Sequence, residues 1–206
     1  MMPVSEASPE TWRLAAQAIA EGGVVAFPTD TVYGIGCDPY SVAAINAIYQ
    51  IKGRAHQKAL PLLLSGRERL AQVAGVLPDA AARLGEHFWP GALTLVVPRA
   101  TGLPGELGGG DTIAVRVPAH DELRAFIEAC GGALASTSAN LSGQPDALDA
   151  GQVAGYFGES IDIIVDGGRV QGGVPSTVVD CTVEPPAILR QGAVSEAAIR
   201  ALLKGV

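Results

Sequence analysis

The sequence has few basic residues for its length. Its 206 residues include 14 lysines and arginines against 21 aspartates and glutamates, which gives a formal net charge of −7. A protein whose main task is to grip a phosphate backbone needs a clustered surplus of lysine and arginine. The composition therefore argues against that class of protein, and we expect any cationic site to be local.

Cysteine is scarce as well. Cys37, Cys130 and Cys181 are far apart in the chain, and no two of them form a CxxC pair. Disulfide frameworks and zinc knuckles need an even or closely spaced set, so neither is supported, and we expect reduced, buried thiols. The three histidines show no HExxH or similar spacing, so the sequence predicts no metal site built from protein ligands.

No apolar run approaches the length of a membrane span. The first residues, "MMPVSEASPE", lack the basic start and apolar stretch of a signal peptide. We therefore expect a cytoplasmic protein that does not enter a membrane. The sequon-like stretch beginning at Asn140 should then carry no glycan, which leaves Asn140 available for another role.

Three familiar motifs are also missing. There is no GxxxxGK[ST] to cradle a triphosphate, and "YGIGCDP" lacks the third glycine of a dinucleotide fingerprint. No GxSxG elbow presents a nucleophilic serine. The sequence thus excludes the P-loop, the dinucleotide-binding fingerprint and the serine hydrolase elbow as sources of function.

What the sequence does contain is a globular composition, with 48% hydrophobic and 17% charged residues, enough for one domain over residues 1–206. Helical and extended patterns alternate, which predicts an α/β domain on a mixed sheet with antiparallel later strands. The glycine-rich segment 101–110 is expected to be a mobile loop. Expected helices are 9–21, 42–52, 67–73, 78–87, 121–130 and 196–203. Expected strands are 24–28, 60–64, 112–118, 132–136, 161–166, 176–183 and 186–190, and segment 89–98 is expected to be a turn followed by a strand.

Polar residues follow several of the expected strands. "PTDTVYGIG" comes after strand 24–28, and "TSANLSG" follows strand 132–136. In open α/β sheets, ligands bind at such strand ends. "STSAN" and "PSTVVD" are equally compatible with ordinary turn and capping chemistry, so each of these signals leaves both interpretations open.

Isolated cations give a second set of signals. Lys52 and Arg54 flank Gly53 at a helix end, with Lys58 nearby; they suit a polyphosphate, or they are a solvated helix end. Arg116 interrupts the apolar strand "IAVRVP", where an unpaired guanidinium would be costly. It needs an anion, which is either a ligand or a structural carboxylate.

Taken together, these segments resemble a known family. "GGVVAFPTDTVYGIG", "YQIKGR", "WPGALTLVV", "IAVRVPAH", "ALASTSANLSG", "PSTVVD" and "ILRQGAVS" follow the order and spacing of the L-threonylcarbamoyladenylate synthases of the YrdC-like fold. The resemblance covers almost the whole chain. It implies an open, mixed, twisted sheet flanked by helices, with a concave ligand pocket.

The resemblance also implies an activity and its residues. Members of this family make threonylcarbamoyl-AMP and pyrophosphate from L-threonine, bicarbonate and ATP, with Mg²⁺ accompanying the ATP, for threonylcarbamoyladenosine modification of tRNA. Downstream tRNA threonylcarbamoyl transferase proteins are the implied partners, and tRNA binding by this chain is expected to be weak. Lys52 and Arg54 are the implied catalytic residues. L-threonine would be held by Thr31, Arg116, Ser136 and Ser176, and ATP by Lys52, Arg54, Lys58, Thr112, Ser138, Asn140, Asp146 and Arg190.

Two departures from the family pattern affect this assignment. Some members have a histidine near the position of Leu63, and others have asparagine where Lys58 stands. The chain also stops soon after "LRQGAVS", where longer members carry a further domain. Two alternatives are kept: an RNA-binding module that uses the same concave face, which the acidic balance disfavours, and a carbamoyl-transfer domain of the same fold, which depends on partner domains.

Overall fold

The computed structural model describes residues 4–53 and 58–204, and Arg54 therefore lies outside the described residues. These residues form one ten-stranded sheet in the order β1-β8-β2-β3-β7-β4-β6-β5-β9-β10. The strands are β1 Val4–Glu6, β2 Val25–Phe27, β3 Gly34–Cys37, β4 Leu62–Leu64, β5 Leu93–Pro98, β6 Thr112–Arg116, β7 Ala133–Ser138, β8 Ile163–Asp166, β9 Thr177–Asp180 and β10 Ala187–Arg190.

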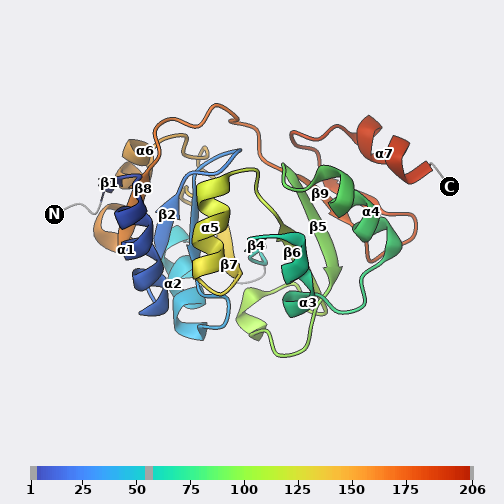
Figure 1. Ribbon diagram of the computed structural model, residues 1–206, viewed down its shortest axis with the longest axis horizontal. Helices are drawn as coiled ribbons and strands as arrows, with labels where there is room; N and C mark the ends of the chain where they lie inside the picture. The colour runs from blue at the N-terminus through green and yellow to red at the C-terminus, as the bar shows by residue number, and fades with distance from the viewer. Residues whose placement is uncertain (1–3, 54–57, 205–206) are drawn as a thin grey trace.

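Seven α-helices and three short 3₁₀ helices of the described chain accompany the sheet (Figure 1). The α-helices are α1 Pro9–Ala20, α2 Val42–Lys52, α3 Leu70–Val73, α4 Asp79–Phe88, α5 Asp121–Ala129, α6 Ala150–Phe157 and α7 Glu196–Lys204. The 3₁₀ helices are η1 Arg67–Arg69, η2 Gly105–Leu107 and η3 Gly158–Ser160. The expected alternation of helices and strands is confirmed. Helix α6 and strands β1 and β3 were not anticipated from the sequence.

The expected mixed sheet is confirmed, but the directions of its later strands are only partly as predicted. Strands β9 and β10 pair antiparallel, as expected. Strand β8 instead lies parallel to β1 and β2, and β9 lies parallel to β5. Parallel neighbours need a long crossover. Neither β8 nor β9 follows directly in the chain on the strand beside it. Helix α6 precedes β8, and residues 167–176, the orange connection along the top of Figure 1, run from β8 to β9 at the other end of the sheet.

Helix boundaries follow local capping signals. The Ser8 hydroxyl accepts a hydrogen bond from the Thr11 N–H at the start of α1. Ser41 caps α2, which ends at Gly53 in the left-handed conformation with φ 58°. Such caps satisfy N–H groups that have no partner within the helix. The predicted starts of these helices are therefore confirmed, and so is the cap of α7 by Ser195.

The sheet has two unequal faces. Residues alternate between two buried clusters: Ala26 and Leu62 belong to the larger one, while Phe27 and Leu63 belong to the smaller one. The larger cluster includes residues of α2, α3, α4, α6 and α7. Within the described chain, the smaller cluster takes its helical residues from α1 and α5 alone, and its strand residues from β2, β4, β7 and β8. On that face, β5, β6 and β9 are left without a helical cover, and in Figure 1 they lie to the right of α1 and α5.

Segment 101–110 differs from the mobile loop that was expected. It contains η2, and Leu107 is fully buried. The Arg99 guanidinium donates hydrogen bonds to the carbonyls of Leu103, Pro104 and Gly108. The buried Leu107 side chain and the hydrogen bonds from Arg99 hold this loop in a compact conformation. Among the described residues, no helix is long and apolar enough to cross a bilayer.

Candidate active site

A cavity of about 320 Å³ opens on the part of the sheet face that α1 and α5 leave uncovered. Its walls come from the 29–34 segment, from strands β4, β5, β6, β7, β9 and β10, and from the connection that ends at Ser176. Many of these residues carry hydroxyl groups. The lining residues are Thr29, Thr31, Val32, Tyr33, Gly34, Ala59, Pro61, Leu63, Thr94, Ala114, Arg116, Ser136, Thr137, Ser138, Asp146, Pro175, Ser176, Val178 and Arg190.

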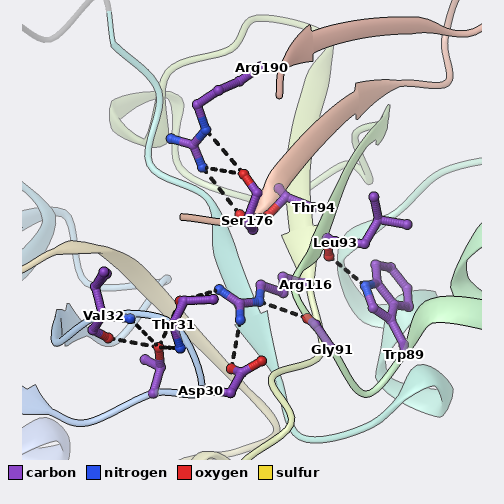
Figure 2. A network of polar contacts seen from close by, with 11 residues as sticks. Asp30, Thr31, Val32, Trp89, Gly91, Leu93, Thr94, Arg116, Ser176 and Arg190 are labelled. Atoms are coloured by element: carbon purple, nitrogen blue, oxygen red, sulfur yellow. Dashed lines mark hydrogen bonds and ion pairs between the residues drawn. The ribbon is translucent and has the colours of Figure 1, made fainter. Parts of the chain in front are cut away.

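Arg116 occupies the end of β6 and is held by three groups (Figure 2). Its Nε donates to the Gly91 carbonyl at 2.9 Å, and its Nη1 donates to Thr31 Oγ1 at 3.0 Å. Its Nη2 pairs with Asp30 Oδ1 at 2.6 Å. A guanidinium has five N–H donors, so this arrangement fixes its plane and leaves two N–H groups for another acceptor.

The electrostatics of Arg116 follow from its burial. Its side chain is 8% exposed, and that of Asp30 is 15% exposed. Burial lowers the Arg116 pKa; the Asp30 carboxylate opposes that shift, and the nearby Arg190 guanidinium adds to it. The sequence left open whether the partner of Arg116 is a structural carboxylate or a ligand. The structure supplies the carboxylate and also places Arg116 in the cavity wall.

A second polar group, above Arg116 in Figure 2, joins β5, β10 and the end of the connection that leads into β9. The Arg190 guanidinium, on β10, donates to the Ser176 carbonyl at 2.9 Å and to Ser176 Oγ at 3.2 Å. Ser176 Oγ lies 2.7 Å from Thr94 Oγ1, on β5. These contacts place one cation and two hydroxyls on the same wall of the cavity.

Lys52 reaches the end of β7 from helix α2. Its Nζ donates to the carbonyls of Ser138 and Asn140, at 2.5 and 2.6 Å, and to Asn140 Oδ1 at 2.9 Å. The Ser138 hydroxyl donates to the same Asn140 Oδ1 at 2.7 Å, and Asn140 Nδ2 donates to the Gln144 carbonyl at 2.5 Å. Lys52 is only 2% exposed. In this structure it therefore orders the turn after β7, and through Asn140 it orients the Ser138 hydroxyl that faces the cavity.

The structure brings together most of the predicted site residues. The cavity lining includes Thr31, Arg116, Ser136, Ser138, Asp146, Ser176 and Arg190. Four others lie outside the lining: Lys52, Lys58, Thr112 and Asn140. Thr112 shares a sheet face with Ala114 and Arg116, because residues two apart on a strand point to the same side. Arg54 lies outside the described residues.

The segment "TSANLSG" differs from the turn expected at the end of a short strand. Strand β7 continues through Ser138, so Thr137 and Ser138 belong to the strand, where Ser138 pairs with Gly34 of β3. The sequence could not reveal this because hydroxyl residues occur in turns and in strands alike, and pairing with β3 decides between the two. The hydroxyls of Ser136 and Ser138 consequently project from one rigid strand.

Tyr33 and the glycines of β3 are structural. The Tyr33 hydroxyl donates to the Gly168 carbonyl at 2.7 Å and accepts from the Gly167 N–H at 3.1 Å. A Cβ on Gly34 would lie 3.0 Å from the Phe27 ring, and one on Gly36 would lie equally close. Gly34 lines the cavity, and both glycines make room for Phe27.

Thr94 and Asp30 belong to the site and were not assigned a role from the sequence. Thr94 is 6% exposed and lines the cavity, and Asp30 balances the charge of Arg116. A signal for Thr94 was present: it interrupts the apolar stretch "ALTLVV" much as Arg116 interrupts "IAVRVP". A single polar residue in a buried strand is a signal of a functional site whether its side chain carries a hydroxyl, as in Thr94, or a charge, as in Arg116.

Comparisons with known proteins agree with this geometry. The family model for Sua5, YciO and YrdC, described as "Telomere recombination", matches residues 17–192. The threonylcarbamoyl-AMP synthase of Pyrococcus abyssi is 43% identical over 186 residues, which cover 89% of this chain. The enzyme of that name from Bacillus subtilis is 39% identical over 191 residues, or 92% of this chain. This chain spans about half the length of both relatives, 55% in each case.

A solved structure shows the same fold. The crystal structure of P. abyssi Sua5 complexed with L-threonine matches with a TM-score of 0.93 and 39% identity, and the match covers 99% of this chain and 61% of that one. The expected mixed sheet flanked by helices is thus confirmed at the level of a solved relative. With a family model matched over residues 17–192 and relatives about 40% identical over nine-tenths of its length, the chain belongs to the Sua5–YciO–YrdC family.

Proposed function

We propose that this protein is an L-threonylcarbamoyladenylate synthase. It would convert L-threonine, bicarbonate and ATP into threonylcarbamoyl-AMP, pyrophosphate and water, which is an adenylyl transfer. The observation that carries the proposal is the cavity itself, where a buried guanidinium of fixed orientation faces a wall of hydroxyls. Relatives named threonylcarbamoyl-AMP synthase, and a solved relative complexed with L-threonine, support it.

The amino-acid end of the cavity would be formed around Arg116. Its two remaining N–H groups suit a carboxylate, which accepts two parallel hydrogen bonds from one guanidinium. Thr31, Ser136 and Ser176 line the same cavity and offer hydroxyls to the amine and hydroxyl of threonine. The apolar residues Pro61 and Leu63 form part of the wall, where a methyl group finds van der Waals contact.

The nucleotide end would lie toward Ser138 and Asp146, two polar residues of the lining. Lys58 precedes the lining residue Ala59, and Thr112 continues the open face of β6 away from Arg116. Arg190 would contribute its positive charge, and Arg54 would add another from outside the described residues. Lys52 and Asn140 would act mainly by holding Ser138, because their polar atoms are engaged with the turn after β7.

Mg²⁺ fits this donor set as an ion that enters with ATP. Mg²⁺ usually keeps several waters and binds one or two carboxylates together with substrate phosphates. Asp146 is the carboxylate residue among the lining residues found in the described chain, so it would hold the ion together with the phosphates. When bound, Mg²⁺ would neutralise charge on the departing pyrophosphate.

The chemistry asks the protein mainly for positioning. The amine of threonine and bicarbonate give a carbamate, one of whose oxygens attacks the α-phosphorus as the bond to pyrophosphate breaks. Holding two anions in line and neutralising the leaving group are worth more here than a covalent intermediate. Arg116 would hold the amino acid, while Lys58, Arg54 and Arg190 would meet the phosphates.

The decisive experiment is pyrophosphate release by the purified chain with Mg²⁺. We expect release only when ATP, L-threonine and bicarbonate are all present. Arg116→Gln should abolish most of it while the protein still melts cooperatively. Release of ADP and phosphate instead would contradict adenylyl transfer, and activity from carbamoyl phosphate without bicarbonate would favour the carbamoyl-transfer alternative.

A further inference from the structure

Thr94 lies at the floor of the cavity between the strands that carry Arg116 and Val178. The β5–β6 register pairs Leu95 with Val115, so the next pair along the two strands is Thr94 and Arg116. On its other side, β5 pairs Thr94 with Val178 of β9. Directly opposed residues on neighbouring strands have Cβ atoms about 4.5–5.5 Å apart. Thr94 is therefore an immediate neighbour of Arg116.

The hydrogen bonds around Thr94 have a definite direction. Arg190 Nη2 can only donate, so Ser176 Oγ accepts its hydrogen bond at 3.2 Å. Ser176 Oγ and Thr94 Oγ1 are 2.7 Å apart, so one hydroxyl donates to the other. Hydrogen bonds in a chain polarise one another and favour a head-to-tail arrangement. The favoured order runs from Arg190 to Ser176 and from Ser176 to Thr94.

This order leaves one hydrogen unused. The two hydroxyls have two hydrogens, and one of them lies between Ser176 and Thr94. Over residues 4–53 and 58–204, the hydroxyls of Thr94 and Ser176 make hydrogen bonds only with each other and with Arg190. Thr94 is 6% exposed and lines the cavity. Its O–H is thus a buried donor that awaits an acceptor from a ligand.

The surroundings indicate which acceptor this is. Arg116 lies beside Thr94, and Arg190 is close enough to Arg116 for the two positive charges to interact. Asp30 balances one of these charges, so the pair of arginines leaves a net positive charge at the site. An anionic oxygen is the acceptor such a place favours.

We propose that Thr94 donates a hydrogen bond to a carboxylate oxygen of the bound amino acid, with Ser176 relaying the polarity of Arg190 to it. This inference rests on the proposed function, because it takes an amino acid as the ligand of the cavity. Thr94 is then a substrate-binding residue, and Ser176 acts partly through it.

Calorimetric titration with L-threonine tests the inference on three variants and the unaltered protein. Thr94→Val removes the hydroxyl at nearly constant shape and should weaken binding about tenfold or more, the usual effect of losing a hydrogen bond to a charged group. Thr94→Ser keeps the hydroxyl and should bind within about threefold of the unaltered protein. Thr11→Val is the matched control: Thr11 is also buried, but its hydroxyl bonds Ser8 and the Glu6 carbonyl near α1, so L-threonine binding should not change.

A second ligand identifies the atom that Thr94 contacts. With L-2-aminobutyrate, which keeps the carboxylate and lacks the hydroxyl, Thr94→Val should cause the same fold loss. A loss seen with L-threonine alone would mean that Thr94 contacts the substrate hydroxyl, and the carboxylate assignment would be overturned. Equal L-threonine binding by Thr94→Val and the unaltered protein would overturn the inference and leave the proposed function intact. Absence of L-threonine binding to the unaltered protein would overturn both.

Discussion

Arg116 shows how one residue combines folding and binding. Its guanidinium is buried and is held by the Gly91 carbonyl, the Thr31 hydroxyl and the Asp30 carboxylate. A buried charge needs such partners, and removing one of them is far more damaging than replacing the whole pair. The same three contacts leave the guanidinium oriented toward the cavity. Its positioning for a ligand is therefore a by-product of its stabilisation in the fold.

Asp30→Asn should reveal this coupling. The change keeps the size of the side chain but removes the charge opposite Arg116, and we expect the free energy of unfolding to fall by about 3–5 kcal/mol. The double variant Asp30→Asn, Arg116→Gln should recover part of that loss, because no unpaired charge remains. Urea unfolding of the single and double variants measures both effects. A double variant less stable than Asp30→Asn would argue against an electrostatic origin.

Tyr33 gives a pH-dependent prediction. Burial raises its pKa to about 12, against a partial lowering by the hydrogen bond from Gly167, while the unfolded chain titrates near 10. Because the folded pKa is the higher one, the stabilisation is complete below about pH 10 and is lost as the pH rises toward 12. Tyr33→Phe removes the hydroxyl and its two hydrogen bonds, so we expect a loss of about 1–2 kcal/mol at neutral pH.

Comparing the unaltered protein with Tyr33→Phe isolates the contribution of the Tyr33 phenol to the pH dependence of stability. Buried thiols also have raised pKa values, but they are common to both proteins. The stability difference between the unaltered protein and Tyr33→Phe should shrink between about pH 10 and 12, as followed by denaturant unfolding at each pH. A difference that stays constant over this range would show that the Tyr33 phenol does not titrate as described.

Strand β3 is the element whose sequence most obscures its structure. It reads "GIGC", and glycine is disfavoured in strands, yet all four residues are buried. The Phe27 ring of the neighbouring strand β2 fills the space beside both glycines. An aromatic ring over a strand glycine replaces the side-chain packing that glycine lacks. Packing from β2 and pairing with β7 therefore hold this segment as a strand.

Gly34→Ala should test that packing. The added Cβ would meet the Phe27 ring at 3.0 Å and Ser136 Oγ at 3.3 Å, and overpacking of this kind destabilises by about 1–3 kcal/mol. Gly155→Ala, on the exposed side of α6, is the control, because nothing lies within 4 Å of its added Cβ. It should stabilise by about 0.5–1 kcal/mol, since alanine favours helix. Chemical unfolding of both variants decides the matter, and a neutral Gly34→Ala would contradict the packing described here.

At the scale of the whole molecule, the cavity results from unequal coverage of the sheet. Two helices, α1 and α5, supply the helical residues of the smaller cluster in the described chain, and the strands at the other end of that face are left open. The open part carries alternate residues of β5, β6 and β9, such as Thr94, Arg116 and Val178. The pocket is therefore a property of the layer arrangement as much as of any single residue.

Net charge is the other property of the whole molecule, and it bears on tRNA. The chain carries a formal charge of −7, so we expect weak tRNA binding that disappears by moderate salt. Filter binding with labelled tRNA at increasing salt concentrations measures this. Sub-micromolar affinity at physiological salt would contradict the prediction and favour the RNA-binding alternative.

The sequence by itself determined the class of fold, most element positions and several of the residues that line the cavity. Local signals suffice for helix ends such as those capped by Ser8 and Ser41, because a capping hydroxyl bonds an N–H only a few residues away. The order and spacing of the sequence motifs sufficed to assign Arg116 and Ser176 to one pocket, and both residues line the cavity.

Tertiary structure alone decided the partners. Asp30 opposite Arg116, Thr94 beside Ser176 and Lys52 against the turn after β7 join residues more than 80 positions apart, and no local pattern specifies which of them will meet. Tertiary structure also decided that "GIGC" is a strand, that β8 lies parallel to β2, and that β9 lies parallel to β5. Such contacts depend on strand order and on which sheet face remains open. Those features arise from burying the whole set of apolar surfaces at once, not from the preference of any one segment.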